Sequence, residues 1–276
     1  MSRPRTVREW FWIAVCGGAL LAWFRTPRSI VDHTVQASAA FFVGAFVALT
    51  VAGVRSLFTR ASLAVIAAGA AMIGWYAIFH LRFADLQNEL IAQTWSVWRM
   101  IWTDLPAVAP TGTALDEGAL ADRARQLASF LTVASVLFPA WVALLAMTSA
   151  RLTWSWYQRI AHAPILPAAG SFREFRFNDQ LVWFLVLLIA LLLAPVPPAV
   201  RLVAANALLV VAAIYALRGA AVARTLLHGA SPLFIGVLLL IMLPFFYIVP
   251  IGMATLGIAD TWLDFRRRAA RASGVS

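Results

Sequence analysis

The feature that most constrains this chain is a series of long segments that are apolar on every side. The segment LVWFLVLLIALLLA, residues 181–194, contains no polar residue. A strand of an outer-membrane barrel would instead alternate apolar and polar residues in segments of about ten. Runs of about 20 apolar residues are typical of transmembrane helices. The pattern therefore predicts an all-α, polytopic transmembrane helix bundle with about 6–8 membrane segments.

Composition supports the same class and excludes several others. Of the 276 residues, 62% are hydrophobic and 12% are charged, whereas soluble domains are about 45–50% apolar and about 25% charged. The net charge of +10 is the difference between 22 basic and 12 acidic residues; every basic residue is Arg, and the Arg residues lie mostly between apolar runs. There they orient helices and meet anionic headgroups, so the predicted partner is the lipid bilayer and not nucleic acid. The single cysteine, Cys16, excludes an internal disulfide, and no metal or cofactor motif is present.

We expect the apolar segments to form one integral membrane domain, residues 1–276. They fall at about residues 10–24, 35–54, 61–81, 127–148, 181–194, 199–217 and 232–258. The first would reach only about 22 Å, so it must extend into polar flanks, thin the bilayer or lie tilted. Pro139 predicts a kink in the fourth segment, and Pro244 and Pro250 break the last one. Rows of small residues around Gly44 and Gly74 predict close packing of the second and third segments.

Residues 83–105 differ from the spanning segments because their apolar residues gather near one face. We expect an interfacial amphipathic helix that lies along the outer membrane face. Trp95, Trp98 and Trp102 recur at helical spacing, which favours headgroup anchors over an aromatic ligand cage. Trp262, at the end of the last apolar segment, is predicted to be an anchor of the same kind.

The distribution of Arg residues predicts the orientation. If the Pro-broken last segment turns back as a re-entrant loop or hairpin, 15 of the 22 Arg lie inside and 7 outside. A single crossing there would leave 11 on each side, and an arrangement with the first run lying flat gives 14 inside and 8 outside. The positive-inside rule favours the re-entrant arrangement. Both termini are therefore expected in the cytoplasm.

Polar residues within the last three apolar segments are the best candidates for a site, because such groups are costly in a membrane unless paired or hydrated. Arg218 is the expected partner of Asp260, and Asp264 is placed to pair with Arg268 four residues on. The cluster either lines a cavity or forms a juxtamembrane cap with one buried hydrogen bond. The candidate cluster comprises Asn206, Tyr215, Arg218, Asp260 and Asp264.

A family resemblance rests on four stretches between residues 172 and 268. These are FREFRFNDQLVW, the Asn206 stretch ending in LLVV, IYALRGAAVA and LGIADTWLDFRRR. They resemble the C-terminal part of the YybS-like family of uncharacterised bacterial membrane proteins, which often has Pro where Asn178 stands. The resemblance implies a bacterial inner-membrane location and supplies no catalytic residue. The general plan is also similar, by analogy alone, to substrate-binding subunits of energy-coupling-factor vitamin transporters.

Two functional hypotheses from different classes remain. The first is a solute-binding or transport component, because broken helices with buried polar groups often line a solute site. The second is a non-catalytic scaffold or assembly partner for other membrane proteins. An enzyme is not predicted, since no nucleophile–base pair or nucleotide-binding motif occurs. A cavity lined by Asn206, Tyr215, Arg218 and Asp260 would favour the first hypothesis, and a filled core would favour the second.

Overall fold

The computed structural model describes residues 6–25, 29–54, 56–104, 117–161, 177–227, 231–245 and 247–265, together with Phe172, Phe175 and Arg268. These residues form ten α-helices and one short 3-10 helix, and no strand occurs among them. The predicted all-α membrane fold is therefore confirmed. The chain divides into two compact units, residues 1–169 and residues 170–276, which are described separately.

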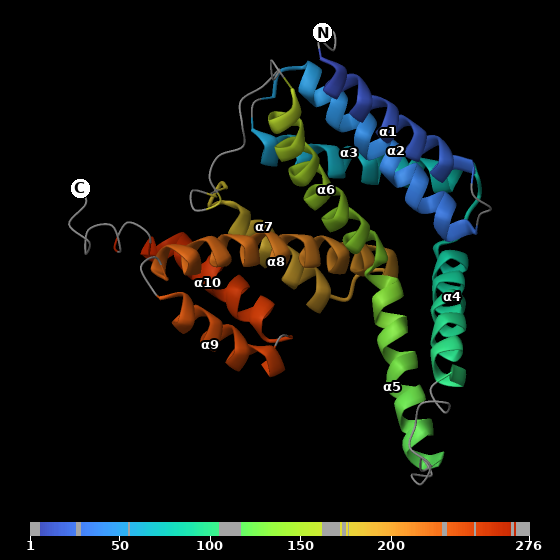
Figure 1. Cartoon of the computed structure of the whole chain (residues 1–276). Helices are drawn as coiled ribbons and strands as arrows, with labels where there is room; N and C mark the ends of the chain where they lie inside the picture. Colours follow the sequence, from blue (N-terminus) through green and yellow to red (C-terminus); the bar gives the residue numbers. More distant parts are fainter. Residues whose placement is uncertain are drawn as a thin grey trace. The chain divides into compact units, whose positions relative to one another are not determined.

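Unit 1, residues 1–169, contains six helices (Figure 1). Serine caps begin two of them. The Ser29 hydroxyl accepts from the Asp32 amide while the Asp32 carboxylate accepts from the Ser29 amide, which is a capping box. The Ser56 hydroxyl accepts from the Thr59 amide at the start of another. The helices are α1 (Val7–Arg25), α2 (Ile30–Val51), α3 (Leu57–Ile78), α4 (Phe83–Asp104), α5 (Glu117–Val136) and α6 (Phe138–Ile160).

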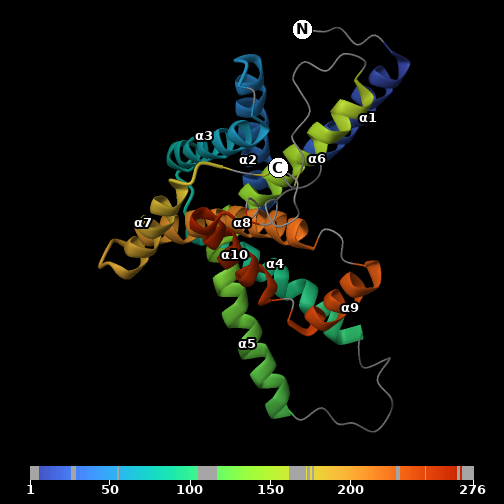
Figure 2. The ribbon, with the colours of Figure 1, turned by 90° about the vertical axis from the view of Figure 1, so that its left-hand side faces the viewer.

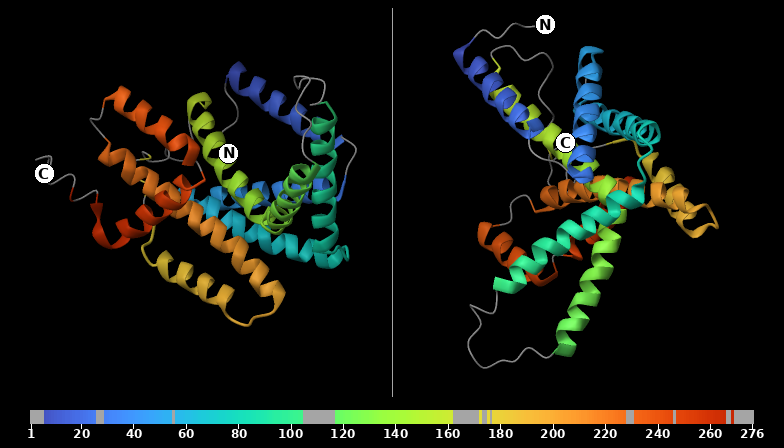
Figure 3. Two further views of the ribbon diagram at one scale, coloured as in Figure 1. Left: turned by 90° about the horizontal axis from the view of Figure 1, so that it is seen from below. Right: turned by 90° about the vertical axis from the view of Figure 1, so that its right-hand side faces the viewer.

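The core of unit 1 is an α2–α3 hairpin against which α6 packs. A hydrogen bond of 2.9 Å joins the hydroxyls of Thr34 on α2 and Tyr76 on α3. Helix α1 lies beside α6 (Figures 2 and 3), and the rings of Trp12 and Trp156 meet edge to face with centroids 5.0 Å apart. The buried side chains of this core are Phe42, Ala64, Ala68 and Ala150.

The small residues that pack the hairpin differ from those expected. A Cβ added at Gly44 or Gly74 would meet nothing within 4 Å, so neither glycine marks a close approach of helices. Ala64 and Ala68 of α3 are buried instead. A spacing rule identifies a row of small residues, but on an all-apolar helix it does not identify the face that packs, because the lipid-facing side is equally apolar.

Pro139 separates two helices and does not simply kink one. Helices α5 and α6 meet at Leu137 with a bend of 62°. A proline lacks an amide hydrogen and collides with the carbonyl four residues earlier, so it disrupts the interior of a helix. It is tolerated in the first turn, and Pro139 is the second residue of α6. The expected segment 127–148 is thus parts of two helices. Helix α6 continues beyond the expected segment as far as Ile160, so residues 151–160 are helical.

Helix α4 covers the range expected for the interfacial helix. Leu86 near its start is 1% exposed, whereas Val97 and Met100 are more than half exposed. The first half of α4 therefore packs within unit 1, and the second half presents apolar side chains outward. Trp95 and Trp98 are half-buried, and the Trp102 side chain lies outside the described residues.

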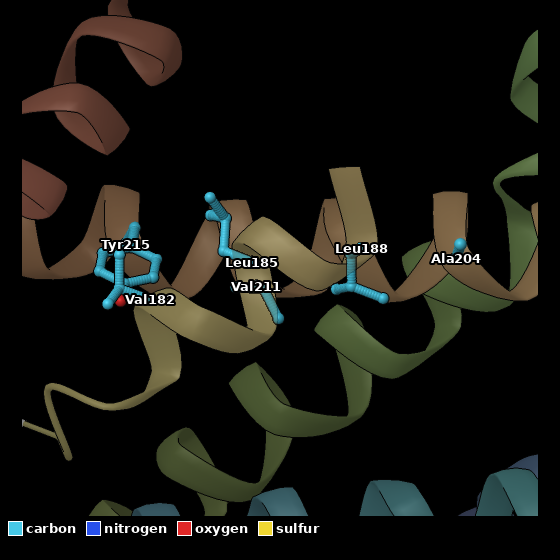
Figure 4. Close-up of a cluster of buried hydrophobic side chains, with 6 residues drawn as sticks. All are labelled: Val182, Leu185, Leu188, Ala204, Val211 and Tyr215. Atoms are coloured by element: carbon cyan, nitrogen blue, oxygen red, sulfur yellow. The ribbon is translucent and has the colours of Figure 1, made fainter. Parts of the chain in front are cut away.

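Unit 2, residues 170–276, is built around α8. Helix α7 packs along it, with Val182, Leu185 and Leu188 facing Ala204, Val211 and Tyr215 in one apolar cluster (Figure 4). Prolines occupy the first positions of α8, α9 and α10, where the missing amide hydrogen is not needed. The elements are α7 (Leu181–Leu193), α8 (Pro198–Leu226), α9 (Pro232–Met242), η3 (Leu243–Phe245) and α10 (Val249–Leu263).

The last apolar segment is broken, as the prolines predict. It forms α9, η3 around Pro244, and α10, which begins one residue before Pro250. In Figures 1 and 3, α9 turns back from the end of α8, and α10 then returns, so that α8 and α10 end on the same side of unit 2. This is the path that a re-entrant loop or helical hairpin would follow.

Four described helices, α1, α2, α3 and α8, are long and apolar enough to cross a membrane, and the bent α5–α6 pair would make a fifth span. Helix α1 has 19 residues because it extends beyond the apolar run at both ends. Helices α7 and α10 have 13 and 15 residues, fewer than the ~20 that a perpendicular span needs. The described chain thus combines full spans with shorter apolar helices.

Candidate functional site

The closest approach of helices in unit 2 is the crossing of α8 and α10. A Cβ added to Gly219 would lie 1.8 Å from the Met253 carbonyl oxygen, and one added to Gly257 would lie 2.0 Å from the Tyr215 carbonyl oxygen. Both distances are shorter than any van der Waals contact, so only glycine fits at these two positions. The backbones of the two helices therefore touch, as at small-residue crossings in membranes.

An ionic cluster lies beside this crossing. The Arg218 Nε donates to Asp260 Oδ2 at 3.0 Å, and Arg218 Nη1 donates to Asp179 Oδ1 at 2.6 Å. The side chains of Arg218 and Asp260 are 0% exposed, whereas that of Asp179 is 53% exposed. The predicted Arg218–Asp260 pairing is present, and it joins α8 to α10. Asp179, directly before α7, bonds to the same arginine, so a third segment of the chain joins the cluster.

Aromatic and hydroxyl side chains complete the cluster. The Phe177 ring meets the Tyr215 ring edge to face at 5.0 Å, and the Arg218 guanidinium carbon lies 5.3 Å from the Phe177 centroid. The buried atoms there that have no hydrogen-bond partner of ordinary geometry in the described structure include Arg218 Nη2, Tyr215 Oη and Thr261 Oγ1. The cluster is thus enclosed, but its hydrogen-bonding capacity is not used up.

Two members of the predicted cluster lie outside this arrangement. Asn206 is three turns before Arg218 on α8, about 18 Å along the helix, and donates to the Leu202 carbonyl at 2.9 Å. Helix α10 ends at Leu263, and Asp264 follows it in the left-handed conformation, with φ 44°. The helix is interrupted at Asp264 itself, and the Arg268 amide then donates to the Asp264 carbonyl at 3.2 Å, so the one-turn spacing between the two residues is kept. The Asp264–Arg268 side-chain pair stays a prediction.

Asp179 and Phe177 were not among the predicted site residues. Both precede α7 in the stretch FREFRFNDQLVW. An acidic residue directly before an apolar helix is usually solvated, so its sequence position alone does not indicate a buried cation as partner. One feature of the sequence could have indicated this pairing. Cationic charge is in excess near the membrane face, and an acid at the start of a neighbouring helix can balance it. Trp262, predicted as an anchor, is 66% exposed on α10.

Unit 1 contains a second buried cation, Arg60 in the first turns of α3. Its side chain is 0% exposed. Nη1 donates to Thr50 Oγ1 at 3.0 Å, and the guanidinium carbon lies 4.3 Å from the Trp154 ring centroid and 5.3 Å from that of Phe46. Nε and Nη2 have no hydrogen-bond partner in the described chain. No periodicity or motif indicated this residue, because an Arg at the edge of an apolar run is normally an interfacial anchor.

Each cluster consists of an arginine held by hydroxyl, carboxylate or aromatic groups. Among the described residues, no three His, Cys, Asp or Glu side chains are placed to hold a metal ion. The acids of unit 2 bind an Arg of the same chain, and no hydroxyl or thiol there is held by a general base. What the arrangement can do is join helices through a buried ion pair and, in unit 1, present a cation without a counter-ion.

Sequence comparison extends over nearly the whole chain. Residues 11–261 match the model of the family DUF2232, described as "Predicted membrane protein". No curated protein and no solved structure matches. The matched range includes α2 to α9 in full and the ionic cluster as far as Asp260. The chain therefore belongs to the DUF2232 family of predicted membrane proteins.

Proposed function

We propose that this integral membrane protein is a non-catalytic scaffold or assembly partner for other membrane proteins. One observation carries the proposal: the polar residues that would line a solute cavity meet in a closed helix crossing. Tyr215, Arg218 and Asp260 are at most 1% exposed, and the helix backbones beside them are in contact. The ion pair therefore holds α8 against α10, and the outer surface is left to make contact with partners.

The outer surface of the described helices supports this role. The second half of α4 exposes Val97 and Met100, and α9 exposes Leu233, Leu240 and Ile241. Part of this apolar surface faces lipid, but apolar faces on helices too short or too amphipathic to span are also suited to helix–helix contacts with another protein.

A solute-binding or transport component is the second candidate, and the three unpartnered polar atoms beside Arg218 favour it. Buried groups without partners are rare in native structures and often mark bound water, an ion or a ligand. A small polar solute that bonds Arg218 Nη2, Tyr215 Oη and Thr261 Oγ1 would satisfy all three. The broken segment that contains α10 is of the kind that lines solute sites in transporters.

Native mass spectrometry of the detergent-purified protein separates the two candidates. The scaffold proposal expects a retained protein partner, and the same partner in Tyr215→Phe and Thr261→Val. Each of these variants removes an unpartnered hydroxyl, so it should leave stability unchanged or raise it. A retained small molecule that both variants lose would overturn the scaffold proposal in favour of solute binding. Ser38→Ala, which removes a hydroxyl bonded within its own helix, is the matched control.

The finer assignments from the sequence form part of the same proposal: a YybS-like relationship, a bacterial inner membrane and cytoplasmic termini. Asp179, Arg218 and Asp260 meet at one end of unit 2, which agrees with a last segment that returns to the side where α8 ends. Alkaline phosphatase fused after Arg271 should be inactive. An active fusion there, with an inactive fusion after Gly112, would show that the orientation is inverted.

A further inference from the structure

Arg60 is buried without a counter-charge, and the surrounding sequence cannot supply one. No Asp or Glu occurs between Asp32 and Asp85, which includes most of α2 and all of α3. None occurs between Asp122 and Glu174, which includes all of α6. A buried guanidinium is strongly unfavourable unless an anion or several acceptors compensate it. The compensating anion must therefore come from outside residues 33–84 and 123–173.

The two unsatisfied nitrogens of Arg60 are a matched pair. Nε and Nη2 form one edge of the planar guanidinium, and their N–H bonds point in nearly the same direction. This edge binds two oxygens of a phosphate or carboxylate at once. The third nitrogen, Nη1, is held by Thr50 Oγ1 at 3.0 Å. Thr50 donates its own proton to the Phe46 carbonyl at 2.7 Å, so its oxygen is fixed as the acceptor.

Aromatic rings fix the plane of the guanidinium without bonding to this edge. Trp154, 7% exposed, lies 4.3 Å from the guanidinium carbon, and Phe46 lies on α2 at 5.3 Å. Cation–π contacts stabilise the charge but accept no hydrogen bond along the edge. The edge is itself covered by side chains, so an anion binds after a local shift of those side chains.

The position in the fold indicates phosphate as the anion. Arg60 lies in the first turns of α3, Thr50 in the last turn of α2, and Trp154 in the last two turns of α6. Helix ends and tryptophans lie where spanning segments meet the headgroup layer, and that layer presents phosphate diesters at high local concentration. The N-terminal end of α3 adds its own positive dipole.

We propose that the Nε–Nη2 edge of Arg60, held by Thr50 and Trp154, binds a phosphate group at the membrane interface. The phosphate comes either from the headgroup of an anionic phospholipid or from a soluble phosphate compound. The site belongs to unit 1 and is independent of the scaffold role proposed above.

The test measures thermal unfolding of the full-length, delipidated protein in a neutral detergent. One arm titrates short-chain phosphatidylglycerol and the other titrates inorganic phosphate. We expect phosphatidylglycerol to raise the unfolding midpoint of the wild type. Arg60→Gln should weaken its apparent affinity by about tenfold or more, because two charge-assisted hydrogen bonds are lost. A response to phosphate alone would support the site with a soluble ligand, and a response to phosphatidylglycerol would support the lipid.

Arg151→Gln is the matched control, since it removes an exposed Arg from α6 and should leave the titration unchanged. Arg60→Lys keeps the charge but lacks the two-pronged edge, so it should bind more weakly than the wild type even if Arg60→Gln does not fold. Equal affinity in the wild type and Arg60→Lys, or no shift of the wild-type midpoint with either probe, would overturn the proposal.

Discussion

Among the described residues, units 1 and 2 each bury one arginine completely, but they neutralise it differently. In unit 2, Arg218 contacts Asp260 at 3.0 Å and Asp179 at 2.6 Å. In unit 1, Arg60 contacts a threonine hydroxyl and two aromatic rings, and no carboxylate of the described chain bonds to it. Arg60 lies in the first turn of α3, whereas Arg218 lies eight residues before the end of α8.

The difference distinguishes an arginine that joins helices from an arginine that can bind an external anion. An Arg bonded to two acids of its own chain joins helices, and removing the Arg leaves its buried acid without a counter-charge. An Arg whose side-on edge lacks an acceptor gains little from its own chain and much from an external anion. We therefore expect substitutions of Arg218 to act on stability, and substitutions of Arg60 to act on the response to phosphate.

The largest expected effect breaks the unit 2 cluster. Asp260→Ala and Arg218→Ala should each lower the free energy of unfolding by about 3–5 kcal/mol, because the first removes the buried counter-ion of Arg218 and the second leaves buried Asp260 without a cation. The double variant should lose clearly less than the sum of the two. Thermal unfolding in detergent measures all three. Strict additivity would mean that the two residues are not coupled, and the contrast between the units would fail.

The next effect concerns the crossing that brings these charges together. Gly257→Ala should destabilise by about 1–3 kcal/mol, because its Cβ would overlap the Tyr215 carbonyl and force α8 and α10 apart. Gly252→Ala is the matched control on the same helix, where an added Cβ meets nothing within 4 Å. Equal unfolding midpoints for the two variants would show that the helices do not touch at Gly257.

Much of the fold followed from the sequence, because apolar length and proline position act locally. The all-apolar runs predicted the helices, and Pro244 indicated where the last one breaks. The exact packing faces did not follow. Gly44 and Gly74 face away from other helices, since a uniformly apolar helix contains no signal that distinguishes its lipid face from its protein face.

The site was predictable to the extent that charge balance requires pairing. Asp260 needed a cation from another helix, and Arg218 was the available one. Asp179 and Arg60 were not predicted, for different reasons. An acid directly before an apolar helix is usually solvated, and an Arg at the edge of an apolar run is usually an interfacial anchor. Both depend on which helices meet in space, and spacing along the chain does not reveal that.

A smaller effect tests the exposed member of the cluster. Asp179→Asn should cost up to about 1 kcal/mol, because its carboxylate is half exposed and solvent screens its pairing with Arg218. The loss should shrink as salt rises, since screening already weakens the wild-type contact. Thermal unfolding at low and high ionic strength measures this. A loss as large as that of Asp260→Ala would mean that Asp179 is the principal counter-ion.

The smallest effect concerns how unit 1 is held without an ion pair. Its α2–α3 hairpin contains a neutral hydrogen bond of 2.9 Å between Thr34 and Tyr76. Tyr76→Phe removes this bond and keeps the ring, so it should lower the unfolding free energy by about 0.6 kcal/mol, the average for such bonds in membranes. Ser38→Ala, which removes a hydroxyl bonded to the Thr34 carbonyl of its own helix, is the control. A Tyr76→Phe loss that approached the Asp260→Ala loss would show that neutral contacts hold unit 1 as strongly as charges hold unit 2.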